Sequence, residues 1–252
     1  MIKFFRHIRQ SLINQNRTKK YLLYAIGEII LVVIGILIAL QINNWNENKA
    51  LANTEYVYMQ NLKEDLQVDT ELYNEYLKKN IELFKIIDNI VFQLSQDDFK
   101  STSDASVFNA RILTTKWNRV LPVERTYEQM KSSGQLKIIN EQKVSDLISD
   151  YYNSTFELST YNEALLVWLE SYIKIMGRVY DGKVLMQILK TSKRVSTNNT
   201  AIITDDRKII NELITNVQYI YGAIKLSENI VIKRKEKAQK LIEVIDQSYM
   251  KK

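Results

Sequence analysis

Residues 22–42 read LLYAIGEIILVVIGILIALQI, and only Glu28 and Gln41 among these 21 positions carry strongly polar side chains. An α-helix rises about 1.5 Å per residue, so this stretch makes a helix roughly 31 Å long, which matches the hydrocarbon core of a bilayer. A helix in a soluble core normally keeps a polar stripe, and positions 29–40 have none. The stretch therefore predicts one membrane-spanning helix near the N-terminus.

The flanks of this span predict its orientation. Six basic and no acidic residues lie at positions 1–20, whereas Lys49 is the only basic residue between the span and Lys63. Because an excess of Lys and Arg holds its side of a span in the cytoplasm, we predict a single-pass bacterial inner-membrane protein with a cytoplasmic N-terminus and a periplasmic C-terminal part. The basic residues are Lys3, Arg6, Arg9, Arg17, Lys19 and Lys20, and the aromatic residues predicted to anchor the interfaces are Tyr21, Tyr24 and Trp45.

A cleaved signal peptide is the competing interpretation, because Ala50-Leu51-Ala52 has the small-residue pattern of a cleavage site. The apolar region of a signal peptide is usually about 7–15 residues long, and cleavage follows soon after it. Here the apolar run is longer, and Ala52 lies ten residues beyond Ile42. The sequence therefore favours an uncleaved anchor with three parts: a basic cytoplasmic arm at 1–20, a transmembrane helix at 21–43 and an extracytoplasmic helical domain at 44–252.

Charge and composition exclude several classes of function. The 252-residue chain has a net charge of +6, but the first 20 residues hold six of its 35 Lys and Arg, which leaves 29 basic and 29 acidic side chains in the rest. The basic balance thus belongs to the topology signal and does not predict nucleic-acid binding. Cysteine is absent and His7 is the only histidine, so the outer domain has no thiolate, histidine base or Cys/His metal site. We predict neither an enzyme nor a cofactor.

The pattern of the outer domain predicts an all-α fold, a bundle of long antiparallel helices joined by short connecting helices. Six glycines and one proline are too few for the turns of a strand-rich fold. Over residues 54–94 apolar residues recur at helical spacing, and Asp69 and Asn80 occupy two of the same positions. The stripe is wider than a coiled-coil seam. Further helices are predicted at about 105–117, 126–133, 141–179, 183–190 and 205–245, with polar turns at 95–106 and 191–200.

Some local features follow from side-chain chemistry. Thr126 is predicted to cap the helix that it begins, and the Asp205-Asp206 pair is well placed at the start of the last helix. The segment ALLVWL at 164–169 is too short for a second span and is predicted to be buried, whereas KRKEKAQK at 233–240 is predicted to be a solvated face. Carboxylates that are adjacent on a helix point about 100° apart, so none of these pairs predicts acid–base catalysis.

Two stretches resemble a known family. Residues 25–49, AIGEIILVVIGILIALQINNWNENK, preceded by MIKFFRHIRQ and KKYLLY, look like the N-terminal signature of a domain-of-unknown-function family of single-pass membrane-anchored bacterial proteins, chiefly from Bacteroidota. Residues 126–153, TYEQMKSSGQLKIINEQKVSDLISDYYN, are similar to the central motif of that family. The resemblance implies a single-pass anchor and a helical outer domain. It implies no established activity and supplies no catalytic residue.

Inside the predicted span, Glu28 is an ionisable group and raises a functional hypothesis. Two interpretations stay open: its side chain reaches the cytoplasmic interface or sits protonated beside Tyr24, or it makes a polar contact with a partner helix. Gly35 and Ala39 form a small-xxx-small pair, and Gly27 lies two turns before Gly35 on nearly the same face. This face would allow a second helix to approach closely, in a homodimer or with another membrane protein.

Three hypotheses for function remain at this stage. The leading one is a membrane-anchored, non-enzymatic scaffold or interaction module, whose partners are the lipid bilayer and a second copy or another envelope protein. The alternative is a ligand-sensing bundle that signals through a partner protein, since about 20 cytoplasmic residues leave no room for an output domain. A carboxylate-dependent envelope hydrolase is the least favoured.

Overall fold

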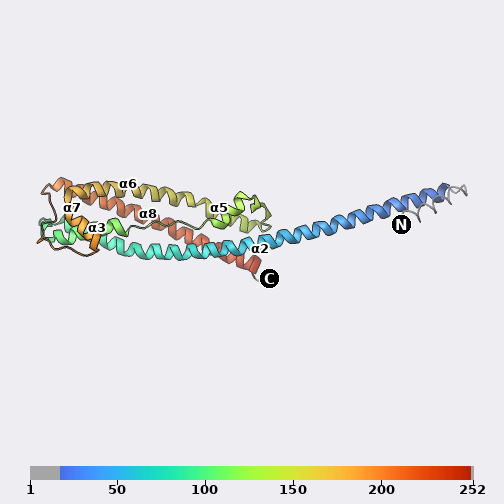
Figure 1. The fold of residues 1–252 in the computed structure, drawn as a ribbon, viewed down its shortest axis with the longest axis horizontal. Helices are drawn as coiled ribbons and strands as arrows, with labels where there is room; N and C mark the ends of the chain where they lie inside the picture. Colours follow the sequence, from blue (N-terminus) through green and yellow to red (C-terminus); the bar gives the residue numbers. More distant parts are fainter. Residues whose placement is uncertain (1–17, 251–252) are drawn as a thin grey trace. The chain divides into compact units, whose positions relative to one another are not determined.

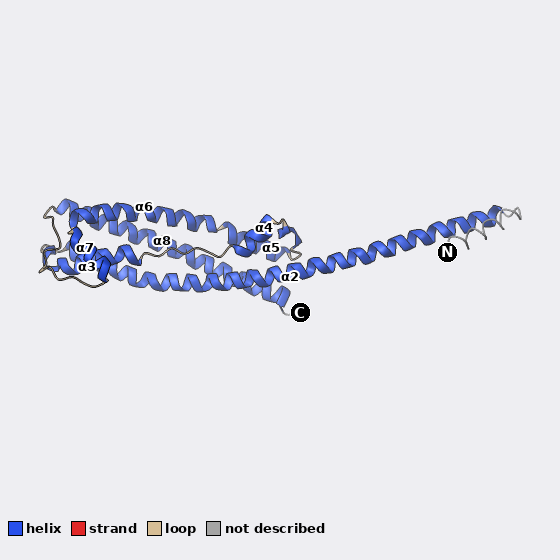
Figure 2. Cartoon of the chain, in the orientation of Figure 1, coloured by secondary structure: helices blue, strands red, loops and turns tan. Residues whose placement is uncertain are grey.

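The computed structural model describes residues 18–250, with the backbone alone at positions 18, 20 and 21. Within this range all regular elements are helices (Figure 2), and the one β-type contact is an isolated bridge between Tyr180 and Ile202. The predicted all-α class is therefore confirmed. The α-helices are α2 (Thr18–Ser95), α3 (Ser103–Lys116), α4 (Arg125–Ser132), α5 (Gln142–Asn153), α6 (Thr155–Val179), α7 (Gly182–Thr191) and α8 (Arg207–Ile245), with shorter turns at η1 (Phe99–Thr102), η2 (Gln135–Ile138) and η3 (Asp246–Met250).

The chain divides into two compact units between Val57 and Tyr58, and α2 contributes to both. No glycine or proline lies between Gly35 and Pro122, so the chain has no residue that favours a break in this helix. In the first unit the apolar side chains of α2 are exposed, with Leu23 at 72% and Leu31 at 67%. The helix is long and apolar enough to cross a membrane by length and composition.

In the second unit α2 buries the stripe that its sequence predicts. The nine apolar residues of that stripe are all at most 2% exposed: Met59, Leu62, Leu66, Tyr73, Tyr76, Leu83, Ile87, Ile90 and Leu94. Asp69 and Asn80, the two polar residues at stripe positions, are buried as well. One face of α2 is therefore entirely inside, and burial of this face contributes most of the stabilisation of the helix.

The core of the second unit has an apolar cluster at each end and a polar middle. One cluster joins the last turns of α2 to α3, α6, α7 and the first half of α8. The other joins residues 59–66 of α2 to α4, α5 and the last turns of α8. Between them lies a small cluster built on Tyr73, Tyr76 and Val231. Buried polar side chains gather in this middle region and form the candidate site described below.

Helices α6 and α8 lie side by side (Figure 1), and the residues that join them run in opposite order along the two helices. Arg178 pairs with Glu212 at 3.0 Å, and Ser171 accepts a hydrogen bond from Asn216 at 2.9 Å. Helix α8, which covers most of the helix predicted at 205–245, has apolar residues at helical spacing that are each at most 1% exposed: Ile210, Leu213, Val217, Ile220, Ile224, Val231, Ala238, Leu241 and Ile245.

Several loop and helix-end predictions are confirmed. The side chain of Asp206 accepts a hydrogen bond from the Lys208 N–H at 2.8 Å and caps α8. Gly134 has φ +68° just after the end of α4, a left-handed conformation that glycine adopts without steric cost. The short helix predicted at 183–190 is α7, whose first turn is capped by Asp181.

Four predictions about individual helices and segments are wrong. The helix expected over 141–179 is two helices, α5 and α6, with Ser154 between them. Thr126 does not cap α4, because it lies inside the helix with Glu124 at the N-cap. Within ALLVWL only Leu165 is buried, since the segment has an ordinary two-sided pattern and Val167 is 66% exposed. The KRKEKAQK segment is not a uniformly solvated face either: Arg234 and Ala238 are buried.

Candidate functional site: a buried polar cluster

Five polar side chains meet in the middle of the helical unit, and four of them are fully shielded from solvent. Asp65 and Asp69 lie one turn apart on α2 together with Tyr73, Tyr151 comes from the end of α5, and Arg234 comes from α8. Asp69, Tyr73 and Tyr151 are 0% exposed and Arg234 is 1% exposed. Charged side chains are almost never this deeply buried unless they are paired, so the hydrogen bonds of the cluster explain its existence.

The hydrogen bonds of the cluster form one directed chain. The Arg234 Nε–H donates to the Tyr73 hydroxyl at 3.0 Å, and the Tyr151 hydroxyl donates to Asp69 Oδ2 at 2.5 Å. The two hydroxyls lie 2.9 Å apart. Because the Tyr151 hydrogen goes to the carboxylate, Tyr73 must donate to Tyr151. The order is Arg234, Tyr73, Tyr151, Asp69, and the ionised carboxylate is the final acceptor.

The pKa of Asp69 is shifted by this environment. Burial raises the pKa of Asp69 from 3.8 to about 6, although the hydrogen bonds from Tyr151 and the Val123 N–H and the attraction of Arg234 oppose the rise. Burial also raises the pKa of both Tyr73 and Tyr151 above the ordinary value of 10. At neutral pH the carboxyl is therefore ionised and both phenols are neutral donors, which is the protonation state that the chain of hydrogen bonds requires.

Arg234 also holds the junction between α5 and α6. Its Nη1 donates to the Tyr151 carbonyl at 3.1 Å and to the Ser154 hydroxyl at 2.8 Å, while its guanidinium carbon lies 4.5 Å from the centre of the Tyr151 ring. The Ser154 hydroxyl donates to the same carbonyl at 2.6 Å. Carbonyls in the last turn of a helix need partners outside it, and these two side chains supply them. The interruption of the predicted 141–179 helix is stabilised in this way.

Asp65 and Asp69 together position the segment around the only proline. Asp65 accepts hydrogen bonds from the Thr126 N–H at 3.0 Å and from Arg125 Nη2 at 2.7 Å, so a carboxylate of α2 satisfies the N-terminus of α4. Asp69 Oδ1 accepts from the Val123 N–H at 2.7 Å. The non-helical segment at 118–123, between α3 and α4, is therefore held against α2 by two side chains that are four residues apart.

Removing the Asp65 carboxylate is expected to loosen α4. Asp65→Ala leaves the Thr126 N–H and the Arg125 guanidinium without their acceptor, which we expect to lower the free energy of unfolding by about 2 kcal/mol. This corresponds to a fall in Tm of roughly 4 to 8 °C for a domain of this size. Thermal unfolding and amide hydrogen exchange of the full-length protein in detergent measure it. Faster exchange should be confined to residues 123–134, and Glu64→Ala, which alters an exposed neighbour, should change neither quantity.

The cluster is suited to joining helices and not to catalysis. Its titratable groups are sealed from solvent, so a substrate has no access to Asp69 or to either phenol. It instead connects α2, α5 and α8 through side chains that are 78 to 161 residues apart in sequence. Among the described residues, no group of three or more His, Cys, Asp or Glu side chains is arranged to hold a metal ion.

The sequence pointed to part of this cluster and missed the rest. The polar interruptions at Asp69 and Asn80 marked α2 stripe positions, and both are buried. The KRKEKAQK pattern predicts a solvated face for Arg234, because this arginine stands among lysines. The signal that identifies it is its spacing: it lies three residues after Val231 and four before Ala238, so it occupies a position of the α8 apolar stripe.

The site residues predicted inside the span belong to the first unit of the chain. In the described part of α2, Gly27, Gly35 and Ala39 are exposed, and Glu28 is partly exposed. A side chain added at Gly27 or Gly35 would meet no atom within 4 Å. Tyr24 is 44% and Trp45 is 60% exposed, with Lys49 Nζ lying 5.4 Å from the Trp45 ring centre. Lys19 is exposed. Lys3, Arg6, Arg9 and Arg17, and the side chains of Lys20 and Tyr21, lie outside the described residues.

Comparison with known proteins assigns the chain to a family without assigning it a function. A family model described as a family of unknown function (DUF6090) matches residues 28–217, which include the whole of the second stretch quoted above and most of the first. No curated protein and no solved structure matches the chain. Because the family match covers well over half of the chain, this protein belongs to the family of unknown function DUF6090.

Proposed function

We propose that this protein is a membrane-anchored, non-enzymatic interaction module. Residues 21–43 cross the bacterial inner membrane once, residues 1–20 lie in the cytoplasm, and residues 44–252 lie in the periplasm. There the long helices form an antiparallel bundle whose outer surface binds a partner, either a second copy or another envelope protein. The opposite contact order of α6 and α8 supports the antiparallel arrangement.

The observation that carries this proposal is the exposed apolar part of α2. Its 18-residue window of highest hydropathy is 0% buried and has no polar stripe. Among the described residues, no apolar surface covers it. A continuous exposed apolar surface of this kind is unfavourable in water and favourable in lipid. The basic residues that precede it and their near absence after it support the cytoplasmic N-terminus.

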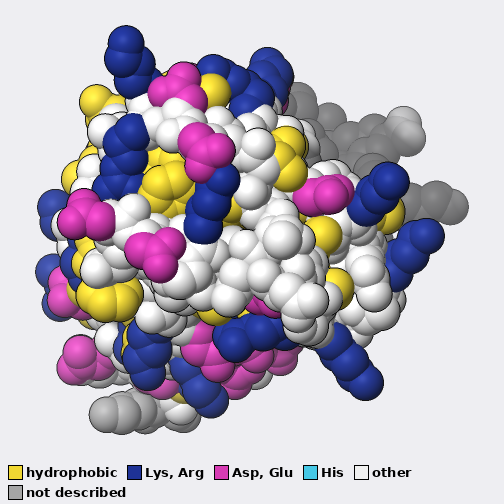
Figure 3. Space-filling view, turned by 90° about the vertical axis from the view of Figure 1, so that its left-hand side faces the viewer, with side chains coloured by type: hydrophobic (Ala, Val, Ile, Leu, Met, Phe, Trp, Pro, Cys, Tyr) yellow, Lys and Arg dark blue, Asp and Glu magenta, His cyan; other side chains and the backbone are white. Residues whose placement is uncertain are grey.

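Two features support an interaction role over an enzymatic one. The titratable groups of the polar cluster are closed to solvent, and the predicted outer domain has no histidine or cysteine. The face of the helical unit drawn in Figure 3 carries Lys and Arg side chains interspersed with Asp and Glu. Such a surface suits selective contacts with another protein and lacks the extended basic stripe of a nucleic-acid site.

The absence of cysteine allows a direct test of topology. Ser196→Cys, in the exposed loop before α8, and Ser11→Cys, in the basic arm, each introduce the only thiol of the chain. We expect a membrane-impermeant maleimide to label Ser196→Cys in intact spheroplasts and to label Ser11→Cys only after the membrane is permeabilised. Labelling in the opposite order would contradict the proposed orientation. Labelling of both variants in intact spheroplasts would contradict a cytoplasmic arm.

Crosslinking in native membranes followed by mass spectrometry tests the interaction role. We expect reproducible crosslinks from exposed lysines of the second unit to one partner protein or to a second copy. If the second copy associates through the small-residue face of the span, Gly35→Ile should reduce those homodimer crosslinks, because a large side chain prevents close approach. Recovery of no reproducible partner would count against the scaffold role.

A further inference from the structure

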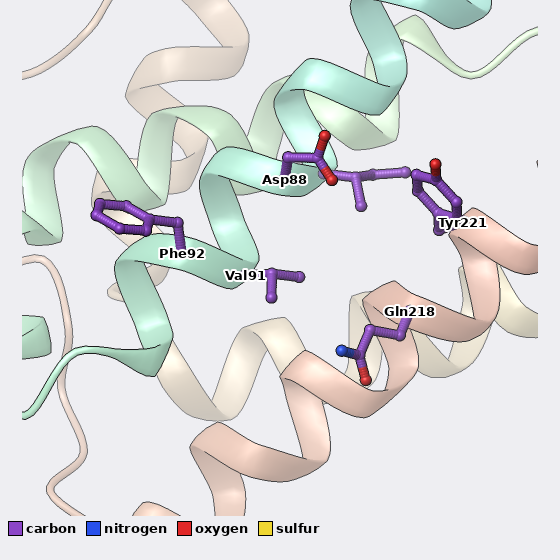
Figure 4. Close-up of a pocket in the computed structure, with 6 residues that line it drawn as sticks. Asp88, Val91, Phe92, Gln218 and Tyr221 are labelled. Atoms are coloured by element: carbon purple, nitrogen blue, oxygen red, sulfur yellow. The ribbon is translucent and has the colours of Figure 1, made fainter.

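A cleft of about 360 Å³ lies between α2 and α8, on the outside of the second unit and away from the polar cluster. Figure 4 shows Val91 on α2 and Gln218 and Tyr221 on α8 on opposite sides of it, with Asp88 at its upper edge. This volume falls in the range of clefts that take small organic molecules, about 300–1,000 Å³. The cleft is lined by Ile87, Asp88, Val91, Phe92, Gln218 and Tyr221.

The lining of this cleft is mainly apolar and aromatic. Ile87 forms part of the hydrophobic core and is 1% exposed, so the base of the cleft is apolar and continuous with the core. Tyr221 is 37% exposed, and its ring lies 4.5 Å from that of Phe84, which fixes its orientation. Phe92 is 66% exposed at the rim. Together these side chains offer apolar contact to the body of a ligand.

One negative charge stands in this apolar setting. Asp88 is the only charged residue that lines the cleft, and within the described residues it has no hydrogen-bond or ion-pair partner. Lys225, on the next turn of α8, is held by Glu228 at 2.8 Å and lies 5.5 Å from the Phe84 ring centre. The chain thus already places an ammonium group against this aromatic pair, an arrangement that the negative face of a ring stabilises.

From this combination we infer that the α2–α8 cleft binds a small organic cation, with the ammonium group of the ligand at the Asp88 carboxylate and its apolar body against Val91 and Tyr221. The site does not depend on the proposed membrane topology or on the identity of a protein partner. A second cleft, between α5 and α8, does not offer the same chemistry: three lysines and two carboxylates line it, and Lys237 already pairs with Asp150 at 2.8 Å.

The test uses the full-length protein in nanodiscs of zwitterionic lipid, with empty nanodiscs as the background for partitioning into lipid. The probe is 2-(4-fluorophenyl)ethylammonium, followed by fluorine NMR line broadening. Its neutral analogue, 2-(4-fluorophenyl)ethanol, has the same apolar body without the charge. We expect the cation to bind saturably and about two to five times more tightly than the alcohol, since only the cation gains the Asp88 contact.

Two variants and a control localise the binding. Asp88→Asn should weaken binding of the cation about two- to fivefold and leave binding of the alcohol unchanged. Tyr221→Leu keeps apolar volume but removes the ring that the apolar body of the ligand contacts, so it should weaken binding of the cation and of the alcohol to the same extent. Glu163→Gln removes the same charge from an exposed position on α6 and should change neither. Asp88 is exposed and Tyr221 is more than one-third exposed, so both variants should keep the Tm of the parent.

Three results would overturn the inference. One is no saturable binding of the cation above the empty-nanodisc background. Another is equal affinity of the wild type and Asp88→Asn for the cation. The third is equal affinity for cation and alcohol, which would make the cleft a purely apolar groove, suited to docking a protein segment instead.

Discussion

Replacing Arg234 with alanine is expected to lower the free energy of unfolding by about 3–5 kcal/mol, the usual cost of removing one partner from a buried charged network. This corresponds to a fall in Tm of roughly 6 to 20 °C. The substitution removes the donor to the Tyr73 hydroxyl, the Tyr151 carbonyl and the Ser154 hydroxyl. It also removes the positive charge that opposes the rise in the pKa of Asp69.

Thermal unfolding of the full-length protein in detergent, followed by tryptophan fluorescence and circular dichroism, measures this effect. Lys233→Ala, which removes an exposed positive charge one residue away, is the matched control and should shift Tm by less than about 2 °C. Combining Arg234→Ala with Asp69→Asn should cost less than the two single effects added, because no buried charge is then left uncompensated. A fall of less than about 2 °C for Arg234→Ala would show that the network does not stabilise the fold.

Asp69→Asn is expected to change how stability depends on pH. The folded-state pKa of Asp69, about 6, lies above its ordinary value of 3.8, so between these values the folded protein binds the proton more tightly than the unfolded chain. Stability from this group is complete below pH 3.8 and is lost as pH rises through 6. The raised pKa corresponds to a loss of about 3 kcal/mol over that interval. Asparagine does not titrate, so the variant lacks this loss.

The measurement compares Tm of the two proteins at intervals from pH 4 to pH 8. The Tm of Asp69→Asn minus that of the wild type should rise by roughly 6 to 12 °C between pH 4 and pH 7 and then stay constant. Asparagine also removes the acceptor of the Tyr151 hydroxyl, a loss that shifts the whole curve without changing its slope. Glu64→Gln, an exposed acid on the same helix, should give a curve parallel to that of the wild type. A constant difference between Asp69→Asn and the wild type would contradict a raised pKa at Asp69.

The polar cluster also favours a single register of the long helices. The apolar stripes of α2 and α8 repeat every three or four residues, so apolar packing alone would tolerate a shift of one helix by a turn. Such a shift would separate Arg234 from Tyr73 and leave buried polar groups unpaired, which costs several kcal/mol. A second contact of the same kind, from the Tyr76 hydroxyl to Ser227 at 2.9 Å, opposes the same shift.

The sequence by itself determined the all-α class, the apolar part of α2, and which faces of α2 and α8 are buried. These follow from helical periodicity and length, which are properties of residues close together in the chain. It also marked Asp69 as a polar residue at a core position. Composition alone removed histidine and cysteine chemistry from residues 44–252.

Only the tertiary structure decided the polar cluster and the helix ends around it. Whether Arg234 faces water or the core depends on Tyr73, which is 161 residues away in the sequence. A pattern of neighbouring residues cannot show a contact between residues so far apart. Asp65 caps α4 from another helix, so the cap is not among the residues that precede α4. Ser154 interrupts a continuous apolar pattern because Arg234 provides a partner for the Tyr151 carbonyl. In each case a buried polar group is satisfied by a residue that is distant in sequence, and only the folded chain brings the two together.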